Sequence, residues 1–125
     1  MLRQLTTLLL LCFLFVSCNF THQEKFNKAK WQEVGDLMSF PARESMLQDL
    51  VTHHQIKGLT YKQVIDSLGE PANYGDTKDS IYYDIVTNYG YLDPKSGTRL
   101  DIGFNKDSVA TGFKVVKWHN RHVNE

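Results

Sequence analysis

The period of the hydrophobic pattern changes once along this 125-residue chain, at Pro71. Before Pro71 apolar residues recur at the three- and four-residue spacing of helices, and after it they recur at every second residue, as in strands. A run of helices followed by a run of strands is typical of an α+β fold. A chain of this length has room for one domain. The pattern therefore predicts one α+β domain in two layers.

The first predicted helix spans about residues 41 to 54. Pro41 suits its first turn, where a missing backbone N–H costs nothing. One face carries the apolar residues that we expect in the core, namely Met46, Leu47, Leu50 and Val51. The remaining residues of these turns are expected to point away from the core: Arg43, Glu44, Gln48 and Asp49.

The second predicted helix begins at Thr60 and ends at Gly69. Thr60 and Gln63 have the spacing of a capping box. Gly69 is the residue type that ends a helix in a left-handed conformation, and Pro71 prevents the helix from continuing. The expected buried stripe consists of Val64, Ile65 and Leu68.

Three strands are predicted after Pro71, because apolar and polar residues alternate in three segments. The expected inward faces are Ile81, Tyr83 and Ile85, then Leu100, Ile102 and Phe104, then Val109, Thr111, Phe113 and Val115. Residues 105–108 form a tight connection, so the last two strands are expected to make a hairpin. A longer loop, residues 87–97, is expected between the first two strands. The predicted fold is therefore two helices packed on one face of a three-stranded antiparallel sheet.

The N-terminus has the features of a secretory signal peptide. Arg3 places a positive charge before an apolar run of about nine residues, Leu8 to Val16. That run is much shorter than the roughly twenty residues that a helix needs to span a bilayer. Residues 1–17 are therefore interpreted as a leader that is removed.

The end of this leader resembles the bacterial lipobox, in which the protein is cut before a cysteine that carries a diacylglyceryl group. The segment reads Leu14-Phe15-Val16-Ser17-Cys18, with Phe15 where leucine is usual. Cys18 is therefore the candidate lipidation site. Since Cys12 would leave with the leader, the mature chain would hold no free thiol. We expect an anchored protein, with several acyl chains in the membrane.

These features divide the chain into four parts. Residues 1–17 are the signal peptide, and residues 18–38 are the lipidated N-terminus and a flexible tether that is polar and rich in lysine. Residues 39–119 are the α+β domain, and residues 120–125 are a C-terminal tail.

The segment from Gly58 to Pro71 resembles the signature of the SmpA/OmlA (BamE-like) small lipoprotein family: glycine, an apolar residue, Ser/Thr, two variable positions, Gln/Glu, valine, then Leu-Gly and proline. The chain also resembles uncharacterised small lipoproteins of the Bacteroidetes type, through Arg43, Met46, Asp49, Leu50, Tyr89-Gly90 and Asp93-Pro94. The resemblance implies a helix–helix–three-strand domain. It also implies an accessory role in outer-membrane protein assembly, although the same architecture in tandem occurs in secreted inhibitors of β-lactamases.

Charge and motifs argue against nucleic-acid binding and catalysis. Fourteen Lys and Arg balance fourteen Asp and Glu, and no basic cluster is present. A metal site is not expected, because His53 and His54 point about 100° apart on a helix and His119 and His122 lie at a chain end. Motifs for a catalytic serine or a phosphate loop are absent from the sequence. We expect no enzyme activity, no cofactor and no small-molecule substrate.

Aromatic residues are the best candidates for binding. Tyr82, Tyr89, Tyr91 and Trp118 are expected on the sheet face opposite the helices or in the loop, and Tyr and Trp are enriched at protein interfaces. Asp93 joins the candidate site, although Asp93-Pro94 is also a common turn former. The alternative is that Trp118 completes the core and that Tyr89 and Tyr91 only pack the loop onto its own domain.

The sequence thus predicts a lipid-anchored, noncatalytic cell-envelope protein that binds an envelope protein, for which outer-membrane assembly machinery is one candidate. The alternative is an inhibitor or sensor that binds a periplasmic protein or peptide through residues 87–97. Asn19 follows the cysteine where aspartate often retains lipoproteins in an inner membrane, so the outer membrane is favoured. The sequence does not distinguish its periplasmic side from its outer surface.

Overall fold

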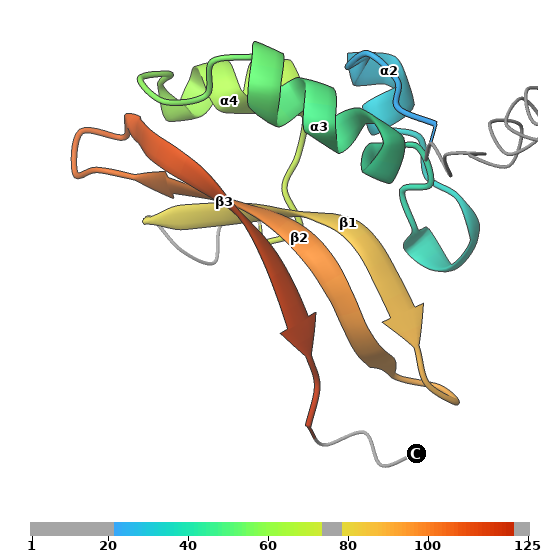
Figure 1. Ribbon diagram of the computed structural model, residues 1–125. Helices are drawn as coiled ribbons and strands as arrows, with labels where there is room; N and C mark the ends of the chain where they lie inside the picture. The colour runs from blue at the N-terminus through green and yellow to red at the C-terminus, as the bar shows by residue number, and fades with distance from the viewer. Residues whose placement is uncertain (1–21, 74–78, 122–125) are drawn as a thin grey trace, which may run out of the picture.

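The computed structural model describes residues 22–73 and 79–121 (Figure 1). The expected signal peptide, Cys18, His122 and most of the C-terminal tail lie outside the described residues. Four short helical elements precede three strands, in this order: α2 (Lys28–Trp31), the 3-10 helix η2 (Asp36–Met38), α3 (Arg43–His53), α4 (Tyr61–Leu68), β1 (Ser80–Tyr89), β2 (Pro94–Phe104) and β3 (Ala110–His119).

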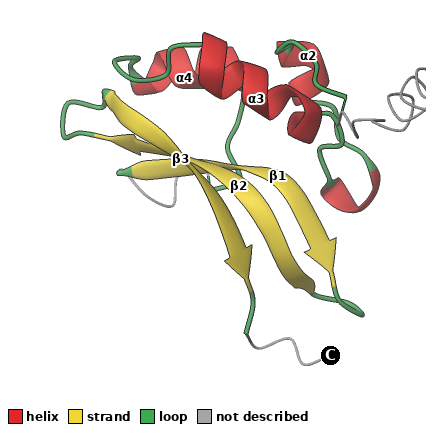
Figure 2. Ribbon diagram, in the orientation of Figure 1, coloured by secondary structure: helices red, strands yellow, loops and turns green. Residues whose placement is uncertain are grey.

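The strands form an antiparallel sheet in the order β1-β2-β3. The helices lie on one face of that sheet, and the opposite face, called the open face below, has no helix over it in the described structure (Figure 2). The predicted fold class, helices packed on one face of a three-stranded antiparallel sheet, is confirmed.

The capping box and the C-terminal end predicted for α4 are confirmed. The Gln63 backbone N–H donates to Thr60 Oγ1 at 3.2 Å, and the Thr60 N–H donates to Gln63 Oε1 at 2.9 Å, which is a complete capping box. Gly69 does end the helix, but with φ 83° and ψ −166° it lies outside the left-handed helical region that was expected, in a conformation that a side chain would disfavour. The Tyr83 hydroxyl donates to the Gly69 carbonyl at 2.8 Å and thereby joins this helix end to β1.

The core lies between the helices and the sheet. Its members come from the three α-helices, from the connection between α3 and α4, and from all three strands. They are Trp31, Met46, Leu50, Ile56, Val64, Leu68, Ile81, Tyr83, Ile85, Leu100, Ile102, Phe104 and Ala110. The expected inward faces of β1 and β2 are therefore confirmed. In α3 the expected Met46 and Leu50 are buried, with Leu47 and Val51 partly buried.

One residue of α3 contradicts the expected face. Arg43 was expected to point away from the core, yet only 2 % of its surface is exposed. The helix also begins at Arg43, two residues after Pro41. The burial of Arg43 is possible because aromatic rings and backbone carbonyls from other elements surround its guanidinium, an arrangement that helix periodicity does not report.

The expected inward face of β3 is corrected at both ends. A register shift at Gly103/Phe104 places Ala110 opposite Phe104, so that Ala110 is buried instead of Val109 or Thr111. Phe113 and Val115 do lie on the side of Ile102 and Leu100, their partners in the register, but they are exposed. They are exposed because the contacts between helix and sheet fall mainly on β1.

The expected long loop at residues 87–97 is also corrected. Thr87 pairs with Gly97, Asn88 with Ser96 and Tyr89 with Pro94, so both strands continue through most of this segment. Only residues 90–93 form the turn. Turn-forming residues are concentrated here, but inter-strand hydrogen bonds extend the ladder up to them.

The expected tether is not a free linker over its described part. Trp31 is completely buried and Phe26 packs against the core. The Phe26 N–H donates to Asp49 Oδ2 at 2.7 Å, and the Glu24 N–H donates to the Ser45 carbonyl at 2.9 Å. The folded unit therefore begins well before residue 39, because two aromatic side chains in a polar segment dock onto α3.

Candidate functional site

The four candidate binding residues lie at opposite ends of β1. Tyr89, Tyr91 and Asp93 are at or beside the turn to β2, whereas Tyr82 is seven residues earlier in the strand. At roughly 3.3 Å per strand residue, Tyr82 and Tyr89 are about 23 Å apart. The structure brings three of the residues together and places the fourth on a separate surface.

The first surface is the tip of the β1–β2 hairpin. The Gly90 N–H donates to the Asp93 carbonyl at 2.8 Å, so Asp93 does help to form the turn. Tyr91 is 97 % exposed and Leu92 is 80 % exposed. Tyr91 therefore does not pack the turn onto its own domain, which excludes that alternative for this residue.

A second apolar segment, which the sequence analysis did not select, lies beside this hairpin. Val34, Leu37 and Met38 are all more than half exposed, and the Tyr89 hydroxyl donates to the Leu37 carbonyl at 3.3 Å. Leu37 has a φ of 54° and Met38 a φ of 58°. In the sequence, this exposed loop was indicated only by Leu37 and Met38, two apolar residues between Asp36 and Ser39 in a segment without a clear hydrophobic period.

The other surface lies on the open face of the sheet. Tyr82 points to this face because its neighbours in β1 are buried on the other side. The Arg99 guanidinium lies 4.9 Å from the centre of the Tyr82 ring, and Arg99 Nε is 2.8 Å from Asp101 Oδ1. Trp118 is half-buried on the same face, where its ring lies over Gly97, its cross-strand partner.

A shallow hollow on the same face adjoins Tyr82 and Asp101. Gly103 lies opposite Gly112 in the register of β2 and β3, so no side chain fills the surface between the strands there. Ser80, Asp101, Thr111 and Lys114 surround the hollow. The open face thus carries two aromatic rings, Tyr82 and Trp118, the Arg99 guanidinium and a hollow. All three side chains are half-buried.

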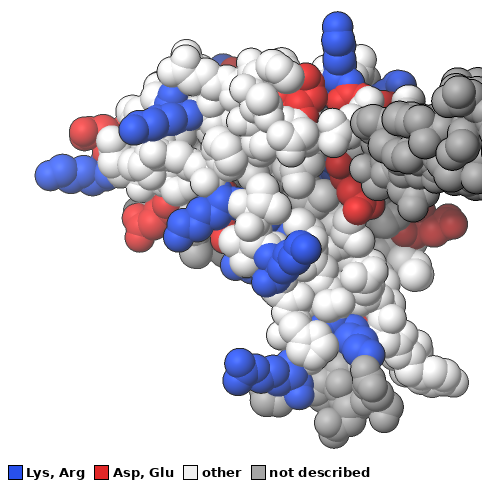
Figure 3. Space-filling view, viewed as in Figure 1, with Lys and Arg blue, Asp and Glu red and all other residues white. Residues whose placement is uncertain are grey.

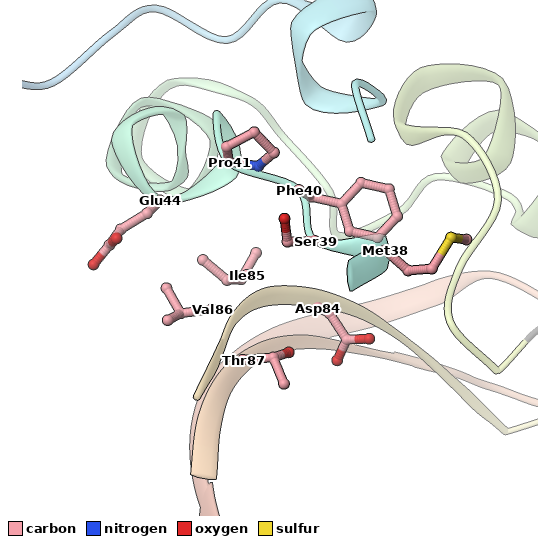
Figure 4. Close-up of a pocket in the computed structure, with 9 residues that line it drawn as sticks. All are labelled: Met38, Ser39, Phe40, Pro41, Glu44, Asp84, Ile85, Val86 and Thr87. Atoms are coloured by element: carbon pink, nitrogen blue, oxygen red, sulfur yellow. The ribbon is translucent and has the colours of Figure 1, made fainter. Parts of the chain in front are cut away.

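A cleft lies between the segment that precedes α3 and the edge strand β1. Figure 4 shows Met38, Ser39 and Pro41 on one side of it and Ile85 and Thr87 on the other. Val86 and Ile85 lie at a register shift between Asp84 and Val86, which bends the strand at this point.

Arg43 contacts Phe40 and the Asp84 carbonyl, and both of these residues line the cleft. Its Nε donates to the Trp31 carbonyl and its Nη1 to the Asp84 carbonyl, both at 2.9 Å. The guanidinium lies 3.5 Å from the centre of the Phe40 ring and 4.9 Å from that of Trp31. Burial lowers the pKa of Arg43 to about 10, although the nearby Asp84 acts in the opposite direction. These contacts are all within the protein, so Arg43 connects α2, α3 and β1.

Asp84 and Asp101 lie on neighbouring strands, and both interact with Arg99. Asp84 lies opposite Arg99 in the register and Asp101 lies opposite Tyr82. Arg99 binds Asp101, and burial raises the pKa of Asp84, an effect that Arg43 and Arg99 partly offset. Arg99 therefore interacts with both carboxylates.

The two adjacent histidines both bind one carboxylate. His53 Nδ1 is 2.9 Å from Asp49 Oδ1 and His54 Nε2 is 3.3 Å from Asp49 Oδ2. The hydrogen bond from the Phe26 N–H, more than those from the two histidines, lowers the pKa of Asp49. Within residues 22–73 and 79–121, no group of three or more His, Cys, Asp and Glu residues is placed to hold a metal ion.

The charged side chains do not form a patch of one sign over the helices on the face that Figure 3 shows. On the face shown in Figure 3, basic and acidic side chains are both spread over the helices. Among the residues that the structure describes, no helix combines the length and the apolar character that crossing a bilayer requires.

Comparisons with protein-family models, with curated proteins and with solved structures gave no match for this chain.

Proposed function

We propose that this protein is a noncatalytic binding module of the bacterial cell envelope, anchored by lipid on Cys18, and that another envelope protein binds the open face of its sheet. The observation that carries the proposal is the pairing of Tyr82 with Arg99 next to the hollow at Gly103 and Gly112, with Trp118 further along the same face. The resemblance to the SmpA/OmlA (BamE-like) family makes outer-membrane assembly machinery the first partner to test.

The chemistry of the open face supports a protein partner. Tyr, Trp and Arg are the residue types that contribute most to protein interfaces, because they combine large contact area with directed hydrogen bonds. Arg99 is held by Asp101 and lies over Tyr82, so these groups lose little conformational entropy on binding. The adjacent hollow can accept a side chain from the partner.

A second candidate function rests on the exposure of the hairpin tip. Tyr91 and Leu92 project from a turn that the Gly90–Asp93 hydrogen bond closes. In this alternative the protein is an inhibitor or sensor, and residues 87–97 bind a periplasmic protein or peptide.

Lipid anchoring is tested first, by the intact mass of the full chain expressed in bacteria. We expect a polypeptide that begins at Cys18 and carries the added mass of its acyl groups. Cys18→Ser is expected to move the protein from the membrane fraction to the soluble fraction. Cys12→Ser is the matched control, because Cys12 lies in the leader, and it should leave both mass and location unchanged. A chain that keeps its leader, or is cut elsewhere without acyl groups, would contradict the proposal.

The partner surface is tested by site-specific photo-crosslinking in cells. A photoreactive residue at Lys114, on the open face, is expected to give a defined protein adduct that Tyr82→Ala weakens. The same residue at Lys57, an exposed position between α3 and α4, is the control and should give none. Crosslinks at Tyr91 that Tyr82→Ala does not affect would favour the second candidate function instead.

A further inference from the structure

Most of the large apolar side chains that are exposed in the described residues gather at one end of the molecule, and Phe113 and Val115 on β3 are the exceptions. Val34, Leu37, Met38, Tyr89, Tyr91 and Leu92 are all exposed, and we call this set the apolar end. In Figure 1, η2 and the β1–β2 turn lie at the right of the view, where the described chain also begins, while α4 and the β2–β3 turn lie at the left. Larger exposed apolar patches mark sites that contact another molecule or a membrane.

The two parts of the apolar end are connected to each other. The hydrogen bond from the Tyr89 hydroxyl to the Leu37 carbonyl links the hairpin to the loop at η2. The loop holds Leu37 and Met38 in the left-handed backbone region, which residues with a side chain seldom adopt. Glycine or asparagine would relieve this strain, so the loop presents apolar side chains at the expense of stability, which is a mark of function.

The described chain begins near the same place. His22 and Gln23 lie beside Pro41 and Glu44, and these two residues also line the cleft that contains Met38 (Figure 4). The Glu24 N–H is bound to the Ser45 carbonyl, so the chain is docked from that residue onward. Cys18 is six residues before Glu24, and six residues span at most about 20 Å when fully extended.

We infer that the apolar end rests on the lipid bilayer, with Leu37, Met38, Tyr91 and Leu92 in its interfacial region. The inference rests on the proposed lipid on Cys18, which brings a membrane surface within about 20 Å of residue 24. Leucine and methionine gain by leaving water, and tyrosine is favoured at the boundary between acyl chains and water. The open face, at the side of the sheet, stays accessible to a protein partner in this orientation.

Hydrophobic contact, rather than charge, selects the surface. Residues of both signs are close in sequence to the apolar end: Glu33, Asp36 and Asp93 are acidic, and Lys30 and Lys95 are basic. We therefore expect the apolar end to enter uncharged phosphatidylcholine bilayers, without a requirement for anionic lipid.

The test uses the full, lipidated chain in phosphatidylcholine vesicles. Because the mature chain is expected to hold no free thiol, single cysteines can carry an environment-sensitive fluorophore. Leu37→Cys and Leu92→Cys report on the apolar end. Asp107→Cys, in the β2–β3 turn, and Lys62→Cys, on α4, are the controls, and all four positions are exposed, so labelling does not require unfolding. Emission at Leu37→Cys and Leu92→Cys is expected to shift to the blue and to be quenched by brominated acyl chains, with neither effect at the controls.

The outcomes separate this inference from the function on which it rests. If the wild-type chain lacks acyl groups and does not float with vesicles, the proposed anchor fails. If the chain is anchored but the fluorophores at residues 37 and 92 report water, as at residue 107, the anchor stands and the inference is overturned. It is also overturned if those fluorophores leave water only after an envelope protein is added.

Discussion

At the scale of single residues, the buried Arg43 has the largest consequence for this fold. Its guanidinium donates to the carbonyls of Trp31 and Asp84, and it stacks on Phe40. Burying a cation is unfavourable unless it is hydrogen-bonded. Here two backbone acceptors and three aromatic rings supply the compensation, so that one side chain joins the N-terminal segment to the sheet.

Replacement of this arginine should be strongly destabilising. Arg43→Ala removes two hydrogen bonds and leaves a void among the rings, and we expect it to lower the free energy of unfolding by roughly 3 kcal/mol or more. Arg43→Lys keeps the charge but cannot reach both carbonyls in the same geometry, so its loss should be smaller. Urea unfolding followed by tryptophan fluorescence measures both. A loss below about 0.5 kcal/mol for Arg43→Ala, the range of ordinary surface substitutions, would contradict this role.

At the scale of secondary-structure elements, the β1–β2 hairpin extends far beyond the strands that alternation predicted. The extension depends on close packing at Gly97, where the Trp118 ring lies on the backbone and a Cβ would meet Trp118 Cε2 at 2.8 Å and the Val86 carbonyl oxygen. Glycine is needed here for space, because only a residue without a side chain allows the three strands and the ring to approach so closely.

Two glycines of the same strand should therefore respond differently to alanine. Gly97→Ala forces the Trp118 ring or the β1 backbone to move, and overpacking of this kind typically costs about 1–3 kcal/mol. In Gly103→Ala the nearest atom is Thr111 Oγ1 at 3.2 Å, on an exposed side chain that can rotate, so we expect little loss or a small gain. Thermal unfolding of the two variants compares them. Equal destabilisation would show that space at Gly97 is not the reason for its glycine.

At the scale of the whole molecule, the segment from residue 22 to Trp31 is part of the folded domain. Phe26 and Trp31 contact each other edge to face at 5.6 Å, and Trp31 lies 6.2 Å from the Tyr83 ring in the core. Asp49 on α3 holds this segment through the Phe26 N–H. The domain is thereby held close to the residue that we propose as its lipid anchor.

The hydrogen bond from the Phe26 N–H to Asp49 makes the free energy of unfolding depend on pH in the acid range. Because the Phe26 N–H stabilises the Asp49 carboxylate, its folded-state pKa lies below the ordinary value of 3.8. The corresponding stability is present above that value and is lost as the pH falls through the folded-state pKa. Asp49→Asn should be less stable than the wild type at pH 7, and the difference should disappear in acid. Urea unfolding between pH 7 and pH 2 measures it.

Asp84→Asn is the matched control with the opposite sign. Burial raises the pKa of Asp84, so its stabilising effect is present below its ordinary pKa and is lost as the pH rises through the folded-state pKa. Asp84→Asn should therefore equal or exceed the wild type in stability at pH 7. If both variants lost the same stability at pH 7, the hydrogen bond to Asp49 would not be the source of the pH dependence.

The candidate site was predictable in part. Tyr91 was predicted as a binding residue close to the turn former Asp93-Pro94. Its exposure agrees with that prediction, because chain reversals lie at the surface. The apolar loop at Leu37 and Met38 was not selected, since exposure depends on what packs above a residue and two isolated apolar residues have no period. The distance between Tyr82 and Tyr89 became clear only when the structure showed that β1 continues to Tyr89.

The sequence by itself determined the elements whose signals are local. The capping box of α4, the stop at Gly69 and the inward residues of β1 and β2 depend on hydrogen bonds and alternation within a few positions, so they can be read from the chain. Only the tertiary structure decided the burial of Arg43, the docking of Trp31 and the exposure of Phe113, because each of these depends on neighbours from distant segments. Local order follows from sequence spacing, whereas burial is a property of the assembled layers.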